Sequence, residues 1–103
     1  MKDFTNLQKM MKTAREMKEK LQKELAEMKI EGSSGGGMVK VVLDGTKNLI
    51  SIAIEPEVVN REEVEMLQDL IIAAFNDAGA KADEKLSEKL GSIGAGLKIP
   101  GLF

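Results

Sequence analysis

The sequence predicts an α+β protein in which two long helices flank a small antiparallel sheet. Residues 39–54 alternate apolar and polar side chains with period two, which is typical of strands. Residues 4–28 and 60–91 instead repeat apolar side chains at every third or fourth position, as amphipathic helices do. A chain of 103 residues buries only a modest core. We therefore expect a single domain over 1–91 and a flexible tail containing glycine and proline over 92–103.

The N-terminal helix has the repeat of a coiled coil. Eight positions follow three-four spacing, and seven of them are apolar: Phe4, Leu7, Met11, Ala14, Lys18, Leu21, Leu25 and Met28. Lys18 interrupts this seam midway, where a polar residue can select register or partner. Met17 lies beside it and can replace it in the packing, so both interpretations stay open.

The segment after this helix is ambiguous, because Met28 and Ile30 also fit an alternating strand. We expect a short first strand over Met28–Glu31, followed by a glycine-rich loop over Gly32–Gly37. Glycine amides can cradle a phosphate, which is the alternative role for this loop. A phosphate-binding loop follows a strand and opens a helix, whereas this loop precedes a strand and lacks the Gly-Lys-Ser/Thr ending. The sequence therefore disfavours a nucleotide site.

The next two strands form a predicted hairpin. Their alternating apolar residues are Val39, Val41 and Leu43 in one strand and Ile50, Ile52 and Ile54 in the other. Asp44-Gly45 between them is a strong hairpin signal, since glycine tolerates the positive φ of a tight turn. Pro56 cannot donate a hydrogen bond to a sheet, so it ends the last strand.

The C-terminal helix is predicted to have Asn60 as its N-cap, because Glu63 follows at the spacing of a capping box. One helical face then runs to about Gly91: Val64, Leu67, Ile71, Ala74, Ala78, Ala82, Leu86 and Leu90. Gly79 interrupts this helix and marks either a close helix approach or a bend. The acidic residues at its start, Glu62, Glu63, Glu65 and Asp69, complement the helix dipole and are a poor metal site without histidine.

The composition excludes several kinds of site. The chain has no cysteine and no histidine, which removes thiolate chemistry, histidine catalysis and the commonest metal ligands. No spacing brings a nucleophile, a base and an orienting group together, and 3% aromatic residues offer little for a substrate pocket. We expect no enzyme, no catalytic residue, no cofactor and no small-molecule substrate. No long apolar run is present, so we expect no membrane span and a cytoplasmic protein.

Charge is unevenly distributed along the chain. The net charge is −2, yet residues 1–29 contain eight basic and five acidic side chains, whereas the remainder contains seven and twelve. Such asymmetry fits a basic contact surface on an acidic body, and it also fits an ordinary solvated helix. Five of the basic side chains lie away from the apolar seam of the first helix: Lys9, Lys12, Arg15, Lys20 and Lys23. A second set has four-residue spacing on the C-terminal helix: Lys81, Lys85 and Lys89.

The lengths of the elements predict a homodimer. A helix of about 25 residues is about 38 Å long, whereas strands of about seven residues span about 23 Å. The apolar helix faces therefore overhang the hairpin, and a sheet of two or three strands is marginal by itself. We expect the sheets of two copies to associate through edges or faces. The candidate dimerisation residues are the alternating apolar ones: Val39, Val41, Leu43, Ile50, Ile52 and Ile54.

An ordered series of short motifs resembles the YbaB/EbfC family of small bacterial nucleoid-associated proteins. The matching pieces are Gly37-Met38-Val39-Lys40-Val41, Asp44-Gly45, Ile54-Glu55-Pro56, Glu65, Leu67, Asp69-Leu70-Ile71, Ala73-Ala74-Phe75-Asn76-Asp77-Ala78, Lys81, Gly96 and Pro100-Gly101. No single piece is specific, but the order is, and it runs along nearly the whole chain. Asp44 stands where the family often has Asn, and Gln68 where it often has Glu; neither change falls on a candidate functional residue.

The resemblance implies an α-β-β-β-α protomer and a tweezer-like homodimer. It also implies binding of double-stranded DNA with low sequence specificity, a change in DNA conformation, a place in the nucleoid, and a role in gene regulation or nucleoid organisation. Under this interpretation the two sets of basic residues described above are the candidate DNA contacts. The alternative is a chaperone-like or adaptor clamp that holds a partner helix through Met10, Met11 and Met17 of the projecting helix.

Overall fold

The predicted α+β class and the α-β-β-β-α order are confirmed. The computed structural model describes the backbone of residues 2–97 and the side chains of residues 4–92. Its elements are the helix α1 (Lys2–Ala26), the strands β1 (Ile30–Ser34), β2 (Val39–Leu43) and β3 (Leu49–Ile54), and the helix α2 (Val64–Leu97). A single turn of 3-10 helix, η1 (Gly35–Gly37), precedes β2, and a second such turn, η2 (Pro56–Val58), follows β3.

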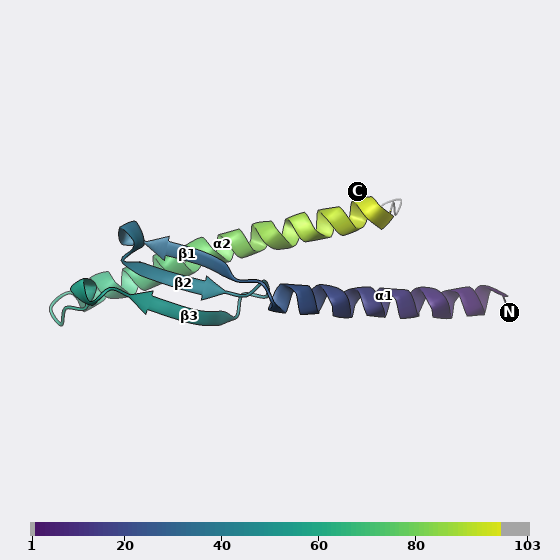
Figure 1. Cartoon of the computed structure of the whole chain (residues 1–103), viewed down its shortest axis with the longest axis horizontal. Helices are drawn as coiled ribbons and strands as arrows, with labels where there is room; N and C mark the ends of the chain where they lie inside the picture. The colour runs from purple at the N-terminus through teal and green to yellow at the C-terminus, as the bar shows by residue number, and fades with distance from the viewer. Residues whose placement is uncertain (1, 98–103) are drawn as a thin grey trace.

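The three strands form one antiparallel sheet in the order β1-β2-β3, and α2 crosses one of its faces (Figure 1). The inward residues of β2 pack against small residues of α2, so that Val39, Val41, Leu43, Ala74 and Ala78 are all at most 1% exposed. Alanines on the helix let it approach the sheet closely. Val58 of η2 belongs to the same cluster, and Leu25 of α1 is buried as well.

The first strand extends further than the sequence predicts. Gly32, Ser33 and Ser34 pair with β2 as strand residues, although the sequence predicts a loop there. The longer strand results from its packing against α2. A Cβ on Gly32 would stand 2.3 Å from the Ala78 backbone nitrogen and 2.5 Å from the Ala74 carbonyl oxygen. Glycine is needed here for a close approach between strand and helix. The true turn is confined to Gly35–Gly37, where all three φ angles are positive.

The hairpin between β2 and β3 is confirmed, but its glycine acts differently. The residue with positive φ is Lys47, whereas Gly45 lies against the end of α1. A Cβ on Gly45 would come within 2.8 Å of the Leu25 carbonyl oxygen, which accepts a hydrogen bond from the Gly45 N–H at 2.8 Å. The turn therefore joins α1 to the sheet.

The second helix begins later and ends later than predicted. The Asn60 side chain accepts a hydrogen bond from the Glu62 N–H at 3.0 Å, so it caps a turn that precedes the helix rather than the helix itself. α2 starts at Val64 and continues to Leu97, which makes residues 92–97 of the predicted tail helical. The rest of that tail, 98–103, lies outside the described residues.

Both helices project beyond the same end of the sheet, and the molecule measures 72 × 22 × 17 Å (Figure 1). Within the described residues α1 is held at its base alone, by buried Leu25 against Gly45 and by an ion pair between Glu24 and Lys89 at 2.8 Å. Neither helix contains, within the described residues, a stretch long and apolar enough to cross a membrane. The overhang expected from the element lengths is thus present, and the tweezer-like dimer stays a prediction.

Candidate nucleic-acid interface

The projecting helix α1 presents a row of unpaired cations. Lys9, Lys12, Arg15, Lys20 and Lys23 are all exposed, and none forms an ion pair with a described residue. Lys9 and Lys23 are separated by about 21 Å along the helix axis at 1.5 Å per residue. An arm of this length carries its positive charges away from the acidic body.

The apolar seam of the same helix is also exposed. Phe4 is 64% exposed, Leu7 52% and Met11 56%, and with Gln8 and Arg15 they line a shallow open groove. Met10, on the neighbouring side of the helix, is 68% exposed. The outer part of the predicted coiled-coil stripe is therefore an exposed surface, whereas Leu25 at its base is buried.

The lysines of α2 differ from those of α1, because each one meets a carboxylate. The Nζ of Lys81 lies 3.1 Å from Asp77, that of Lys89 lies 2.8 Å from Glu24, and that of Lys85 lies 3.9 Å from Glu88. The distance between Lys85 and Glu88 is long, and both side chains are well exposed. The Lys85 ammonium is therefore the most available of the three for contact with another molecule. The sequence placed these lysines correctly on one helix, but it did not reveal that Lys89 pairs with Glu24 of α1.

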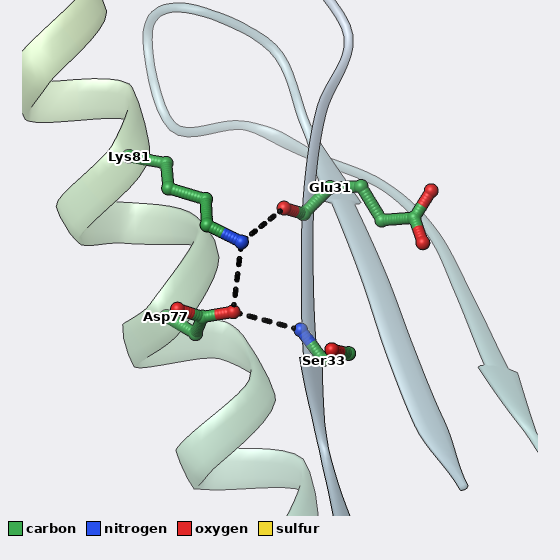
Figure 2. A network of polar contacts seen from close by, with 4 residues as sticks. All are labelled: Glu31, Ser33, Asp77 and Lys81. Carbon is green, nitrogen blue, oxygen red and sulfur yellow. Dashed lines mark hydrogen bonds and ion pairs between the residues drawn. The ribbon is translucent and has the colours of Figure 1, made fainter. Parts of the chain in front are cut away.

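Asp77 and Lys81 bind the outer edge of β1 (Figure 2). Asp77 accepts a hydrogen bond from the Ser33 N–H at 3.0 Å, and Lys81 donates one to the Glu31 carbonyl at 3.4 Å. The Ser33 N–H, and after it the Lys81 ammonium, hold the pKa of Asp77 below its ordinary value. The four-residue spacing of Asp77 and Lys81 was visible in the sequence, whereas their contact with a strand 44 residues away from Asp77 was not.

The ion pair between Glu24 and Lys89 joins the two projecting helices near their base. The hydrogen bond from Lys89 is the main reason why the pKa of Glu24 lies below its ordinary value. Both side chains are about one-third exposed. Sequence reasoning missed this contact, because it depends on how α1 and α2 meet.

The predicted dimerisation residues fall into two groups. Val39, Val41 and Leu43 lie in the core beneath α2, where they serve the protomer itself. Ile50 and Ile52 of β3 are 48% and 42% exposed, and Ile54 is half-buried. Only the second group lies where another molecule can reach it, and its role in dimerisation stays a prediction.

No metal site is evident in the part of the chain that the structure describes, where no group of three acidic side chains converges. The acidic residues at the start of α2 are exposed to solvent. The glycine-rich turn precedes a strand, as the sequence indicated, and opens no helix that would direct amides at a phosphate.

The pattern of the YbaB/EbfC DNA-binding family matches residues 1–97, nearly the entire chain. A nucleoid-associated protein of Caldanaerobacter subterraneus subsp. tengcongensis is 48% identical over 101 residues, covering 95% of this chain and 91% of the relative. The chain belongs to the YbaB/EbfC DNA-binding family. A nucleoid-associated protein of Dictyoglomus thermophilum is 43% identical over 104 residues and is covered completely, as is this chain.

The fold of this YbaB/EbfC protein resembles that of another protein known from a crystal structure. An uncharacterized protein from Helicobacter pylori superposes with a TM-score of 0.77, covering 87% of this chain and 95% of the other. The two sequences are 22% identical, so the likeness concerns the fold alone.

Proposed function

We propose that this protein is nucleoid-associated and binds double-stranded DNA through α1, as a homodimer that presents two such arms. One observation carries the proposal: the five cations of α1 are exposed and unpaired among the described residues, on a helix that projects from the body. Membership of a DNA-binding family supports it, as do the names of the relatives. A place in the bacterial cytoplasm, on the nucleoid, follows from the same proposal.

The chemistry of these contacts accounts for low sequence specificity. Lysine and arginine on an exposed helix neutralise phosphates and release counterions, which favours any duplex equally. The described part of α1 offers few groups that read base edges, since its asparagine and glutamine residues are scattered among charged ones. Sequence preference therefore arises chiefly from how easily a given duplex deforms.

A change in DNA conformation follows from holding two arms in a dimer. Each arm neutralises phosphates over about 21 Å, or about six base pairs at 3.4 Å each. A straight duplex meets both arms only if their separation and direction match it, and otherwise the DNA bends to reach the second arm at a cost of a few kcal/mol. Additional phosphate contacts offset that cost.

A substitution on α1 tests the proposal. Replacing Lys9, Lys12 and Arg15 by Ala together should weaken binding to unrelated duplexes by a similar factor for each, because phosphate contacts carry no sequence information. Fluorescence anisotropy with two or three duplexes of different sequence measures this. Unchanged affinity would remove α1 from the interface.

The matched control replaces the paired cations Lys81 and Lys89 by Ala. It also removes positive charge from a projecting helix, but these ammonium groups already meet Asp77 and Glu24. We expect a smaller loss of DNA affinity than for the α1 variant. Circular dichroism establishes that both variants keep their helices.

A second candidate function is a protein clamp, favoured by the exposed apolar seam of α1. Phe4, Leu7, Met10 and Met11 are each more than half exposed, which suits a groove for an amphipathic helix. Partner binding of this kind resists high salt and falls when Met10 or Met11 becomes polar. DNA binding has the opposite dependence on salt, so one titration separates the two functions.

A further inference from the structure

We propose that Glu24 and Lys89 are positioning residues for DNA binding: their ion pair sets the direction in which the arm α1 leaves the body. This role rests on the proposed function, because a DNA-binding arm contributes only where it points at the duplex. It gives Lys89 a task other than phosphate contact. Neither of the two side chains has to touch DNA to perform it.

The arm is joined to the body at one buried side chain. Leu25 is 6% exposed, and it is the only buried side chain of α1 among the described residues. Its carbonyl oxygen accepts a hydrogen bond from the Gly45 N–H at 2.8 Å, and the glycine leaves room for this contact. The helix stops at Ala26, and residues 27–29 form neither helix nor strand. One such contact holds the base of α1 but leaves its direction free.

The ion pair is a second contact, on a different side of the same helical turn. Glu24 and Leu25 are neighbours in the chain, so their side chains leave α1 about 100° apart. Leu25 meets the turn between β2 and β3, whereas Glu24 meets Lys89 of α2 at 2.8 Å. Among the described residues, this is the one ion pair that joins α1 to another element. Two contacts at different angles fix the direction of a helix that one contact would let swing.

The length of the arm amplifies a small change at its base. Asn6 lies about 27 Å from Glu24 along the helix axis, at about 1.5 Å per residue. A rotation of about 10° at the base therefore moves Asn6 by about 5 Å. Residues 4–16 are all exposed, so packing of the outer arm does not oppose such a rotation (Figure 1).

The surroundings of the ion pair allow it to open without unfolding the protein. Both side chains are about one-third exposed, so a substitution leaves no buried unpaired charge. Glu24 also has Lys20 one turn earlier on its own helix. The hydrogen bond from Lys89 is the main reason why the pKa of Glu24 is low, and the charge of Lys20 adds to it. Loss of Lys89 therefore releases the arm and leaves Glu24 beside another cation.

The direction of the arm can be measured in the free protein. Asn6→Cys and Ser87→Cys place two spin labels, one on α1 and one on α2, in a chain that has no natural cysteine. Ser87 is exposed and lies about half a turn around α2 from Lys89, so its label does not disturb the ion pair. An excess of unlabelled chain restricts the measured distances to single protomers. Pulsed electron paramagnetic resonance then gives the distribution of distances between the labels.

Loss of the ion pair should widen this distribution. We expect Glu24→Gln and Lys89→Met each to increase its width, or to shift its centre, by about 5 Å. The matched control is Lys85→Met, which removes the same charge from the same helix, but from a lysine whose partner Glu88 also lies on α2. Unchanged distributions in Glu24→Gln and Lys89→Met, or an equal change in Lys85→Met, would overturn the proposal. Circular dichroism establishes that each variant keeps its helices.

Exchange of the two charges separates the ion pair from the shapes of its side chains. Glu24→Lys together with Lys89→Glu keeps the net charge and should restore the narrow distribution. In the natural protein and in this variant, a rise from about 0.1 M to about 1 M salt should widen the distribution, because the Debye length falls from about 10 Å to about 3 Å. Lys89→Met should not respond. An equal response to salt in Lys89→Met would contradict an electrostatic contact.

Duplex binding shows whether the direction of the arm matters for function. Glu24→Gln removes a negative charge beside the arm, so attraction to phosphate alone predicts tighter binding. A loosened arm predicts the reverse, with binding about two- to fivefold weaker, the range that a partly exposed ion pair can supply. Tighter binding would overturn the positioning role. The distance measurements contain no DNA, so their failure leaves the proposed function standing, whereas a natural protein that binds no duplex overturns that function.

Discussion

Asp44 organises the turn between β2 and β3 through one carboxylate. Its Oδ1 accepts hydrogen bonds from the Thr46 hydroxyl at 2.6 Å, the Thr46 N–H at 2.8 Å and the Asn48 N–H at 3.0 Å. The Thr46 hydroxyl, followed by the Asn48 N–H, lowers the pKa of Asp44 from its ordinary value. The ionised carboxylate therefore stabilises the turn that also holds the base of α1.

The sign of this pKa shift predicts how stability depends on pH. The folded pKa of Asp44 lies below the unfolded one, so its contribution is complete above the unfolded pKa of about 4 and is lost as pH falls through the folded pKa. Urea unfolding from pH 6 down to about pH 2 should show this loss, and Asp44→Asn should make it shallower. Asp69→Asn, which removes an exposed carboxylate of α2 without such bonds, is the control. An equally steep loss in the Asp44→Asn protein would contradict the assignment.

Gly32 is the tightest point between β1 and α2. Gly32→Ala should destabilise the fold by about 1–3 kcal/mol, because the added methyl group meets helix backbone, which cannot rotate away. The free energy of unfolding from urea titration measures the effect. Gly91→Ala is the matched control: it lies in α2 with open space around it, and we expect a gain of up to about 1 kcal/mol. Similar effects from both substitutions would contradict the close approach at Gly32.

The helices and the hairpin were predictable because each carries its own periodicity. The strand character of Gly32–Ser34 was not, since these residues have no alternation and owe their conformation to α2, far away in the sequence. The sequence placed the start of α2 too early for a local reason. Asn60 followed by Glu63 is compatible with a turn before the helix as well as with a helix cap. Contacts between distant elements, such as Glu24 with Lys89, leave no mark on a single sequence.

The arm α1 and the helix α2 should differ in local stability. Residues 70–82 of α2 pack on the sheet, whereas α1 is anchored at its base and carries exposed apolar side chains along its length. Hydrogen exchange of the free protein should therefore be much faster over residues 5–20 than over residues 70–82. Binding to DNA should slow exchange in the arm. Slow exchange along α1 without DNA would contradict the prediction and would mean that another surface covers the seam.

The whole molecule consists of a packed body, made of the sheet and α2, and a charged arm, α1. The sheet and the middle of α2 form a small core, and α1 carries cations into solvent. The candidate site was predictable as a set of residues, because basic side chains away from an apolar seam can be found by helical spacing alone. The partners of Lys81 and Lys85 lie on the same helix at four- and three-residue spacing, whereas the pairing of Lys89 was not predictable, because folding brings Glu24 to it from α1.

The dependence of DNA affinity on salt tests the central claim most directly. Each phosphate neutralised by α1 should contribute about −0.9 to the slope of log affinity against log salt concentration. In the variant with Lys9, Lys12 and Arg15 replaced by Ala, the slope should be shallower by about 0.9 for each phosphate that α1 no longer neutralises, on a duplex of any sequence. A slope that stays unchanged in this folded variant would contradict the claim that α1 binds the DNA backbone.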